Sequence, residues 1–192
     1  MSQENTKALG GVRYRLSLPS ERARQGRTLD ERLFLRFPIL FRLFGDLWMR
    51  LPPRSRLRRL LLTRLMQRGY AAGKRRDFEV MCAGLDPGIE YHAPGDRLAP
   101  DLDAVLYGHN GYLQVWRYWL DAFKDIRFEP EELLDLGDRL LVTAQLRGRG
   151  SGSGVDVSQP VFQLLEFREG LMVWQADFSD RSKALEAAAL RK

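Results

Sequence analysis

The sequence contains little cysteine and little histidine. Its 192 residues include one cysteine, Cys82, and two histidines, His92 and His109. A single cysteine excludes an intrachain disulfide and a cysteine-based zinc site, and it favours a reducing compartment. Two histidines seventeen positions apart are weak grounds for a metal centre. The sequence also has no Ser-His-Asp arrangement and no phosphate-binding glycine loop. We therefore expect neither a metal nor a cofactor.

A long uninterrupted apolar run is also missing. The longest apolar stretch, residues 33–48, is broken by Arg36, Pro38, Arg42 and Asp46. It falls short of the ~20 apolar residues that a bilayer-spanning helix needs. It also begins too far from Met1 for an ordinary secretory signal, and it has no small-residue cleavage site nearby. We expect a cytoplasmic protein, with attachment to a membrane surface left open.

Acidic residues are scarce in the N-terminal third. Residues 1–68 hold 16 Lys and Arg against 5 Asp and Glu, a net charge of +11, whereas residues 69–192 hold 15 against 20, a net charge of −5. The formal charge of +6 therefore comes from the N-terminal third. Such an asymmetry predicts an arm that meets an anionic surface, beside a domain without that need.

The composition, 44% hydrophobic and 29% charged residues, predicts a folded chain with one core. Residues 1–27 are polar and show no sustained period, so we expect a flexible basic tail. Residues 28–53 are expected to form a basic amphipathic helical extension, in which Thr28 caps a first helix and Pro38 opens a second. Residues 54–192 then form the main domain.

The main domain shows the pattern of an α+β fold. Apolar spacing and capping residues predict helices over residues 54–73, 77–85, 112–123 and 181–190. Strands are predicted over residues 89–93, 126–137, 139–150, 157–168 and 171–178. Asp86-Pro87-Gly88 predicts a turn, and residues 94–111 predict a long loop. The predicted order is helices, one strand, a helix and then an antiparallel meander. This order indicates the α+β class.

Five motifs of the main domain resemble the SnoaL-like branch of the nuclear-transport-factor-2-like superfamily. In chain order they are RGYAAGKRRDFE, LDPGIEYHAP, GHNGY, FEPEELLDLGDRLLV and DFSDRSKALEAAAL. The resemblance covers roughly residues 54–190, and the joint order and spacing of the motifs carry it. It implies a cone-shaped fold, in which a curved mixed sheet wraps around three helices and encloses an apolar pocket. It also implies a homodimer through the sheet.

The resemblance leaves the activity open, because the family includes polyketide cyclases, ketosteroid isomerases, dehydratases, epoxide hydrolases and non-catalytic binding domains. Related isomerases hold a general-base aspartate where this sequence has Ala93, and a second acidic residue at about the position of Gln163. Glutamine forms hydrogen bonds but cannot supply a proton at neutral pH, so binding suits Gln163. His92 is a catalytic candidate, although it faces away from its neighbour on a strand. The alternative is a histidine at a rim or an interface.

Asp177 is the second catalytic candidate. It lies late in the last strand, where cyclase-like relatives use a carboxylate, and the neighbouring Trp174 and Phe178 favour a raised pKa. The alternative is an ion pair with an arginine. Thr143 and Gln145 alternate on a nearby strand and would give a pocket polar anchors if their face points inward. A solvated face is the alternative for these two residues.

Aromatic residues could stack on a polycyclic ligand or could be plain core. The candidates are Tyr70, Tyr91, Tyr107, Tyr112, Trp116 and Trp119. Tyr70 and Tyr112 are preferred because each opens or lines an element that is expected to face the pocket, and each brings a hydroxyl group. The predicted ligand-binding set is Tyr70, Tyr91, Tyr112, Trp116, Thr143, Gln145, Gln163 and Trp174. His109, between two glycines, is expected mainly to shape the turn before a helix.

The basic arm has two interpretations. Its arginines, interleaved with Leu, Phe and Trp, suit an amphipathic segment on an anionic membrane. Alternatively, residues 33–51 pack across the domain or a dimer partner while the arginines stay solvated. Nucleic acid is a poorer partner, because no base-reading motif accompanies the charge.

Three functions follow from these observations. The first is a pocket protein that binds a small apolar or polycyclic molecule. The second is a cofactor-free cyclase, isomerase or hydrolase that uses Asp177 or His92 with Tyr70. The third is an interaction module whose basic arm binds a membrane surface. A carboxylate or histidine that faces an open cavity would favour the second function over the first.

Overall fold

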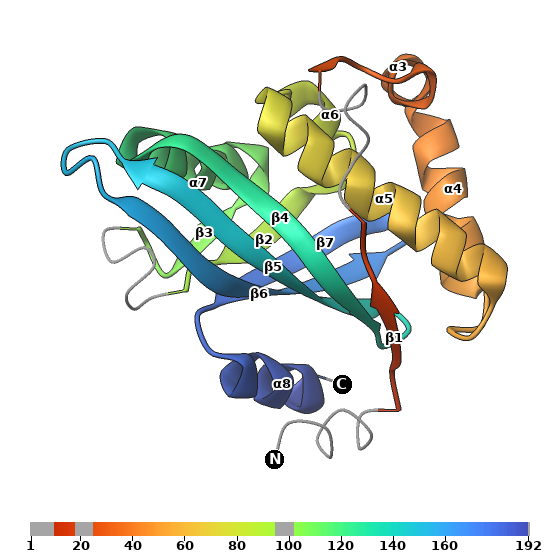
Figure 1. Cartoon of the computed structure of the whole chain (residues 1–192). Helices are drawn as coiled ribbons and strands as arrows, with labels where there is room; N and C mark the ends of the chain where they lie inside the picture. The colour runs from red at the N-terminus through yellow and green to blue at the C-terminus, as the bar shows by residue number, and fades with distance from the viewer. Residues whose placement is uncertain (1–9, 18–24, 95–101, 192) are drawn as a thin grey trace.

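A seven-stranded sheet organises the computed structural model, which describes residues 10–17, 25–94 and 102–191 (Figure 1). The strands are β1 (Val12–Arg15), β2 (Leu85–His92), β3 (Val105–Tyr107), β4 (Phe123–Asp135), β5 (Arg139–Gly150), β6 (Asp156–Arg168) and β7 (Leu171–Phe178). Their spatial order is β1-β4-β5-β6-β7-β2-β3. Only β2 and β7 pair in parallel, so the sheet is mixed.

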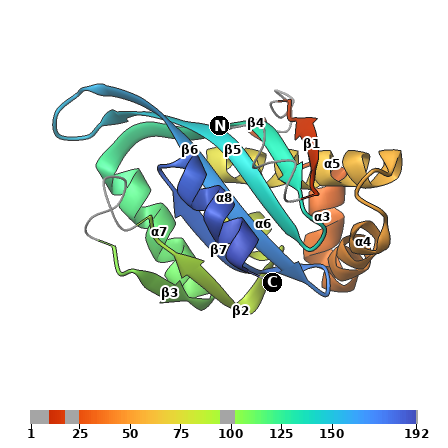
Figure 2. The ribbon, with the colours of Figure 1, turned by 90° about the horizontal axis from the view of Figure 1, so that it is seen from below.

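Helices cover both faces of the curved sheet. They are α3 (Leu29–Arg36), α4 (Pro38–Arg50), α5 (Arg56–Arg75), α6 (Phe78–Cys82), α7 (Gly108–Ala122) and α8 (Arg181–Leu190). Figures 1 and 2 show α5, α6 and α7 on the concave face, α8 on the convex face, and α3 with α4 at one end. The predicted α+β fold, a curved mixed sheet around three helices with an N-terminal helical extension, is confirmed.

Three local differences from the expected elements concern strands. Residues 12–15 lie in the expected flexible tail but form β1, which pairs antiparallel with β4. The expected turn Asp86-Pro87-Gly88 lies inside β2, where the register with β7 shifts between Leu85 and Glu90. Residues 105–107, expected in a loop, form β3 beside β2. Each segment is too short to show a period of its own, and the neighbouring strand supplies its hydrogen bonds.

The helical extension packs on the domain through one face of α4. Trp48 is fully buried, and its ring meets Phe167 edge to face at a centroid distance of 5.2 Å. Gly45 lies against Gly170 in the turn between β6 and β7, so closely that a Cβ on Gly45 would stand 2.2 Å from the Gly170 Cα. Only glycine permits this approach of two backbones.

A buried ion pair fastens the extension to the sheet. Arg58, in the first turn of α5, donates to both carboxylate oxygens of Asp135 at 2.6 and 2.7 Å. Arg58 is 1% exposed and Asp135 0%. The same guanidinium donates to the carbonyls of Trp48, Leu51 and Gly137. One side chain therefore joins the end of α4, the start of α5 and the β4–β5 turn.

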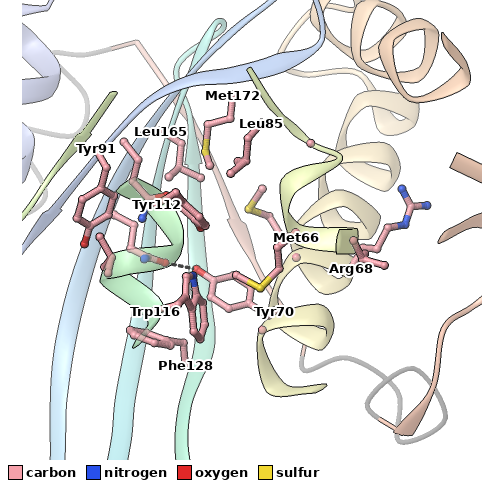
Figure 3. Close-up of a pocket in the computed structure, with 18 of the residues that line it drawn as sticks. Met66, Arg68, Tyr70, Leu85, Tyr91, Tyr112, Trp116, Phe128, Leu165 and Met172 are labelled. Atoms are coloured by element: carbon pink, nitrogen blue, oxygen red, sulfur yellow. Dashed lines mark hydrogen bonds between the residues drawn. The ribbon is translucent and has the colours of Figure 1, made fainter. Parts of the chain in front are cut away.

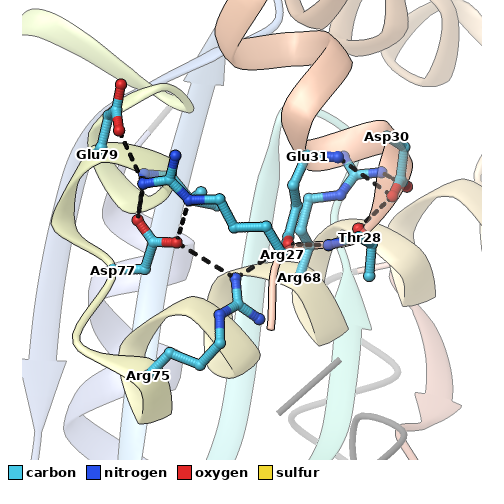
Figure 4. A network of polar contacts seen from close by, with 9 residues as sticks. Arg27, Thr28, Asp30, Glu31, Arg68, Arg75, Asp77 and Glu79 are labelled. Atoms are coloured by element: carbon cyan, nitrogen blue, oxygen red, sulfur yellow. Dashed lines mark hydrogen bonds and ion pairs between the residues drawn. The ribbon is translucent and has the colours of Figure 1, made fainter. Parts of the chain in front are cut away.

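A second polar network holds α3 against α5 and α6 (Figure 4). Thr28 and Glu31 form a capping box, and Glu31, which is buried, pairs with Arg75 at 3.0 Å. Asp30 pairs with Arg64 and Arg68. Partial burial raises the pKa of its carboxyl, but the hydrogen bond from Thr28 and the contacts with both arginines outweigh that effect and hold the pKa well below the ordinary value. The carboxylates of α3 thus point into the molecule, as acidic residues in a first helical turn can.

The helix α8 covers the convex face over β6 and β7. Its Ala184, Leu185 and Ala188 belong to one apolar cluster with Leu164 and Trp174. Asp180 caps the helix by accepting hydrogen bonds from the backbone N–H groups of residues 182 and 183. The predicted homodimer through the sheet stays a prediction.

Candidate functional site

A cavity of about 150 Å³ lies between the concave face of the sheet and helices α5, α6 and α7 (Figure 3). Apolar side chains form most of its wall, among them Met66, Leu85, Phe128, Leu165 and Met172. The strands supply inward side chains at every second residue, and the helices close the open side of the curve. The cavity is therefore a product of sheet curvature and not of a single loop.

The opening of the cavity lies at α5 and β4. Three wall residues are exposed, namely Gly69, Lys74 and Arg127. A Cβ on Gly69 would meet no atom within 4 Å, whereas one on Gly73 would stand 2.8 Å from the Trp116 ring. Gly73 therefore lets α5 and the Trp116 ring approach closely, while Gly69 leaves space at the mouth.

Asp177 is the one carboxylate in the cavity wall. It is 5% exposed, and its Oδ2 accepts a hydrogen bond from the Tyr91 hydroxyl at 2.8 Å. Its Oδ1 accepts from the side-chain amides of Gln175 at 2.9 Å and Gln163 at 3.2 Å. A carboxylate offers about four lone-pair positions, so these three bonds leave room for one more.

Burial raises the pKa of Asp177 above its ordinary value of 3.8, and the hydrogen bonds from Gln175, Tyr91 and Gln163 offset only part of that effect. Within residues 10–17, 25–94 and 102–191, no arginine, lysine or histidine forms an ion pair with it. An uncompensated buried carboxylate holds a proton more readily than an exposed one. Such a group is suited to exchange a proton with a molecule in the cavity.

Tyrosine hydroxyls extend the polar part of the wall. The Tyr70 hydroxyl donates to Gln163 Oε1 at 2.6 Å, so Tyr70, Gln163 and Asp177 form a chain from α5 to β7. Burial raises the pKa of Tyr70 and Tyr112 above the ordinary tyrosine value, and for Tyr112 a hydrogen bond from Trp116 opposes the rise. Both hydroxyls therefore stay protonated and can donate hydrogen bonds.

Six of the sequence-predicted site residues come together in this wall. They are Asp177, Tyr70, Tyr91, Tyr112, Trp116 and Gln163. Gln163 pairs directly with Asp177 across β6 and β7. The two side chains therefore lie on the same face of the sheet, a relation that the sequence analysis did not predict.

The structure places the other four predicted residues on the convex face. His92 contacts the carboxylate of Glu90, and its ring lies 5.1 Å from that of Trp174. Trp174 packs beneath α8 and Arg191. Thr143 and Gln145 share the face of Leu141, which belongs to the same cluster. The reason is strand alternation: Tyr91 and Asp177 point inward, so His92 and Trp174 point outward.

Sequence reasoning missed two features of the wall. Gln175 donates to Asp177 and lies two residues before it on β7, so the period of a strand could have identified it. Gly69 at the mouth left no comparable signal, because its role depends on how α5 meets β4. His109 lies outside the wall, and its Nε2 is 3.3 Å from the Leu85 carbonyl oxygen, beside Gly108 with φ of 67°.

Metal-binding side chains do not gather in the described ranges. No group of three or more His, Cys, Asp or Glu residues there is arranged to hold a metal ion. The polar lining residues are one aspartate, two glutamines and three tyrosines, together with Arg68, Lys74 and Arg127, of which Lys74 and Arg127 are exposed. This set favours hydrogen bonding and proton exchange with an organic molecule.

A family model described as the SnoaL-like domain matches residues 66–175. The match spans more than half of the 192 residues. The chain belongs to the SnoaL-like domain family. The matched region of this SnoaL-like chain includes α6, α7 and β2 to β6, whereas α3 and α4 lie outside it.

Solved structures support the fold of the SnoaL-like chain. TerC, crystallised with polyporic acid, is 22% identical over 63% of this chain and 92% of its own, with a TM-score of 0.53. An NTF2-like protein of unknown function from Burkholderia pseudomallei is 22% identical over 64% and 93%, with a TM-score of 0.55. An NTF2-like protein from Burkholderia thailandensis is 21% identical over 67% and 96%, with a TM-score of 0.54. No curated protein matches the chain.

Proposed function

We propose that the cavity binds a small, mainly apolar molecule with a carbonyl or hydroxyl group, and that Asp177 exchanges a proton with it. The position of Asp177 carries this proposal. It is a buried carboxylate in a mainly apolar cavity wall, it accepts from three neutral hydrogen-bond donors, and no described cation forms an ion pair with it. A purely structural carboxylate at such depth would gain more from an arginine, as Asp135 does from Arg58.

The size of the cavity limits the ligand. An apolar cavity of about 150 Å³ holds a molecule the size of benzene. The buried part of the ligand is therefore about one ring, and a larger molecule would extend through the mouth at Gly69. Polyporic acid, with which TerC was crystallised, serves as one probe.

The chemistry that fits the wall needs no cofactor. Asp177 takes a proton from a carbon next to a ligand carbonyl, and the electron pair of the broken C–H bond moves to the carbonyl oxygen. The hydroxyl of Tyr112 donates a hydrogen bond to that oxygen as its charge develops. Asp177 then returns the proton to the same or another carbon, which exchanges hydrogen or moves a double bond. Such steps are common to isomerases and cyclases.

Binding without reaction is the second candidate function. The same carboxylate would then accept a hydrogen bond from a ligand hydroxyl, and the apolar wall would supply the affinity. Replacement of Asp177 distinguishes the two, because it removes turnover in the first case and only weakens binding in the second. A homodimer through the uncovered part of the sheet remains a proposal for either function.

Blocking the mouth tests the proposed binding. Gly69→Phe places a ring in the free space beside the cavity, so binding of phenol, 1-naphthol or polyporic acid should fall by at least about tenfold. The readout is intrinsic fluorescence, since Trp116 and Trp119 line the cavity. Replacement of a glycine within α5 should also raise helix stability slightly.

Gly69→Ala is the matched control. It also removes the glycine from α5 but leaves the cavity open, so its affinity should equal that of the wild type. Native mass spectrometry of the purified wild-type chain adds an unbiased readout, because a co-purifying molecule should be lost from Gly69→Phe only. Equal affinity of all three proteins for every probe would contradict the proposed binding.

A further inference from the structure

The helical extension carries exposed apolar side chains on the face turned away from the domain. They are Leu33 at 46%, Phe37 at 49%, Ile39 at 60%, Leu43 at 56% and Leu47 at 48% exposure. Ile39, Leu43 and Leu47 are four residues apart and form one row along α4. The opposite face of α4 holds the buried Phe41 and Trp48. Helix α4 is therefore apolar on two faces, and only one of them is covered.

The two apolar faces of α4 bear on the two interpretations of the basic arm, which are packing on the domain and contact with a membrane. The first face packs on the domain, because Gly45 meets Gly170 and Trp48 meets Phe167. The second face has no described element over it. Figures 1 and 2 both show α3 and α4 at one end of the molecule, outside α5. Contiguous exposed apolar residues of this kind mark an interaction surface.

The charge around the row is mainly positive, although Asp46 of α4 is partly exposed three residues after Leu43. Arg32, Arg36 and Arg50 are exposed on the same helices, and none of the three forms an ion pair with a carboxylate in the described ranges. The acidic residues of α3 are turned inward, Asp30 to Arg64 and Arg68 and Glu31 to Arg75. The outer surface thus combines apolar side chains with guanidinium groups that form no ion pair in the described ranges, and that of Arg36 lies over the Phe37 ring.

We propose that this surface, defined by Leu33, Phe37, Ile39, Leu43 and Leu47 with Arg32, Arg36 and Arg50, docks on an anionic lipid membrane. The apolar row enters the boundary between headgroups and acyl chains, while the arginines meet lipid phosphates and carboxylates. The docking is peripheral: no helix in the described part of the chain is long and apolar enough to cross a membrane. It does not depend on what the cavity binds.

Co-sedimentation of the full chain with vesicles tests the docking. The wild type should bind vesicles of phosphatidylcholine mixed with phosphatidylserine, bind pure phosphatidylcholine weakly, and lose binding as salt rises. The triple variant Ile39→Gln, Leu43→Gln, Leu47→Gln should bind the mixed vesicles at least about tenfold more weakly, because each side chain loses its apolar contact with lipid. A second variant, Arg32→Gln with Arg36→Gln and Arg50→Gln, should lose the preference for phosphatidylserine.

Leu190→Gln is the matched control, since Leu190 is 84% exposed but lies on α8, far from this surface. It should bind as the wild type does. Circular dichroism and thermal melting check that every variant keeps the fold, which substitutions of exposed residues normally permit. Absence of wild-type binding, or equal binding by the triple variant, would overturn the proposal. A different result would also overturn it: sedimentation velocity finds the wild type dimeric and the triple variant monomeric, and neither protein binds vesicles.

Discussion

Replacement of Arg58 by methionine is expected to lower the free energy of unfolding by about 3–5 kcal/mol, since it leaves the carboxylate of Asp135 buried without its cation. For a chain of this size, that loss corresponds to a fall in melting temperature of roughly 6–20 °C. The carbonyls of Trp48, Leu51 and Gly137 also lose a donor. Denaturant unfolding and thermal melting measure the effect.

Two further variants locate the origin of that loss. Arg58→Met combined with Asp135→Leu removes both charges, so it should recover part of the stability, although the three carbonyls stay without their donor. Arg149→Met breaks an exposed pair with Asp156, in which the side chains are 59% and 78% exposed, and should leave the melting temperature unchanged. A loss no larger for Arg58→Met than for Arg149→Met would contradict the role given to the buried pair.

Replacement of Asp177 by asparagine is expected to reduce catalysed proton exchange by about 10²–10⁴-fold. Asparagine fills nearly the same space and still accepts a hydrogen bond, but it cannot take a proton from carbon. Hydrogen–deuterium exchange at the carbons next to the carbonyl of a cyclic ketone, such as cyclohexanone in D₂O, gives a readout that NMR follows. Gln163→Leu is a partial control, because it removes one hydrogen bond to the carboxylate and leaves the base in place.

Asp177→Asn is expected to lower activity but to raise the free energy of unfolding, relative to the wild type, as pH rises. A loss of activity can therefore be told apart from a loss of structure. Because the pKa of Asp177 is raised in the folded state, its contribution to stability is present below the unfolded-state pKa and is lost as pH rises through the folded-state pKa. Asp177→Asn has no such dependence. The variant should therefore become more stable relative to the wild type as pH rises through this window, as thermal melting across pH would show.

Strong local signals made much of the fold predictable from the sequence. Thr28 with Glu31 and Asp180 are capping residues, and the helices that follow them begin where those caps indicate. Glycine-punctuated runs predicted β5 and β7 at the residues observed. By contrast, β1 has four residues and depends on β4 for its hydrogen bonds, so no local pattern could identify it.

The candidate site was predictable to the extent that strand alternation applies. Asp177 and Gln163 lie on the inner face, and their cross-strand pairing follows from the turn between β6 and β7. Side chains alternate along β5, so either Thr143 and Gln145 or their neighbours Val142 and Ala144 face the cavity, and the sequence does not decide between the two. In the structure Val142 and Ala144 face inward. No cation in the described ranges forms an ion pair with Asp177. This is a property of the assembled fold, which no spacing in the sequence reveals.

The protonation of Asp177 is the most direct test of the account, because it needs no knowledge of the ligand. In protein labelled with ¹³C at the aspartate side-chain carboxyl, NMR titration should show one resonance that titrates above the ordinary aspartate pKa of 3.8 and disappears in Asp177→Asn. Addition of a cavity probe such as phenol should shift that titration, and Gly69→Phe should prevent the shift. An Asp177 carboxyl that titrates at or below 3.8 and does not respond to any probe would contradict the account.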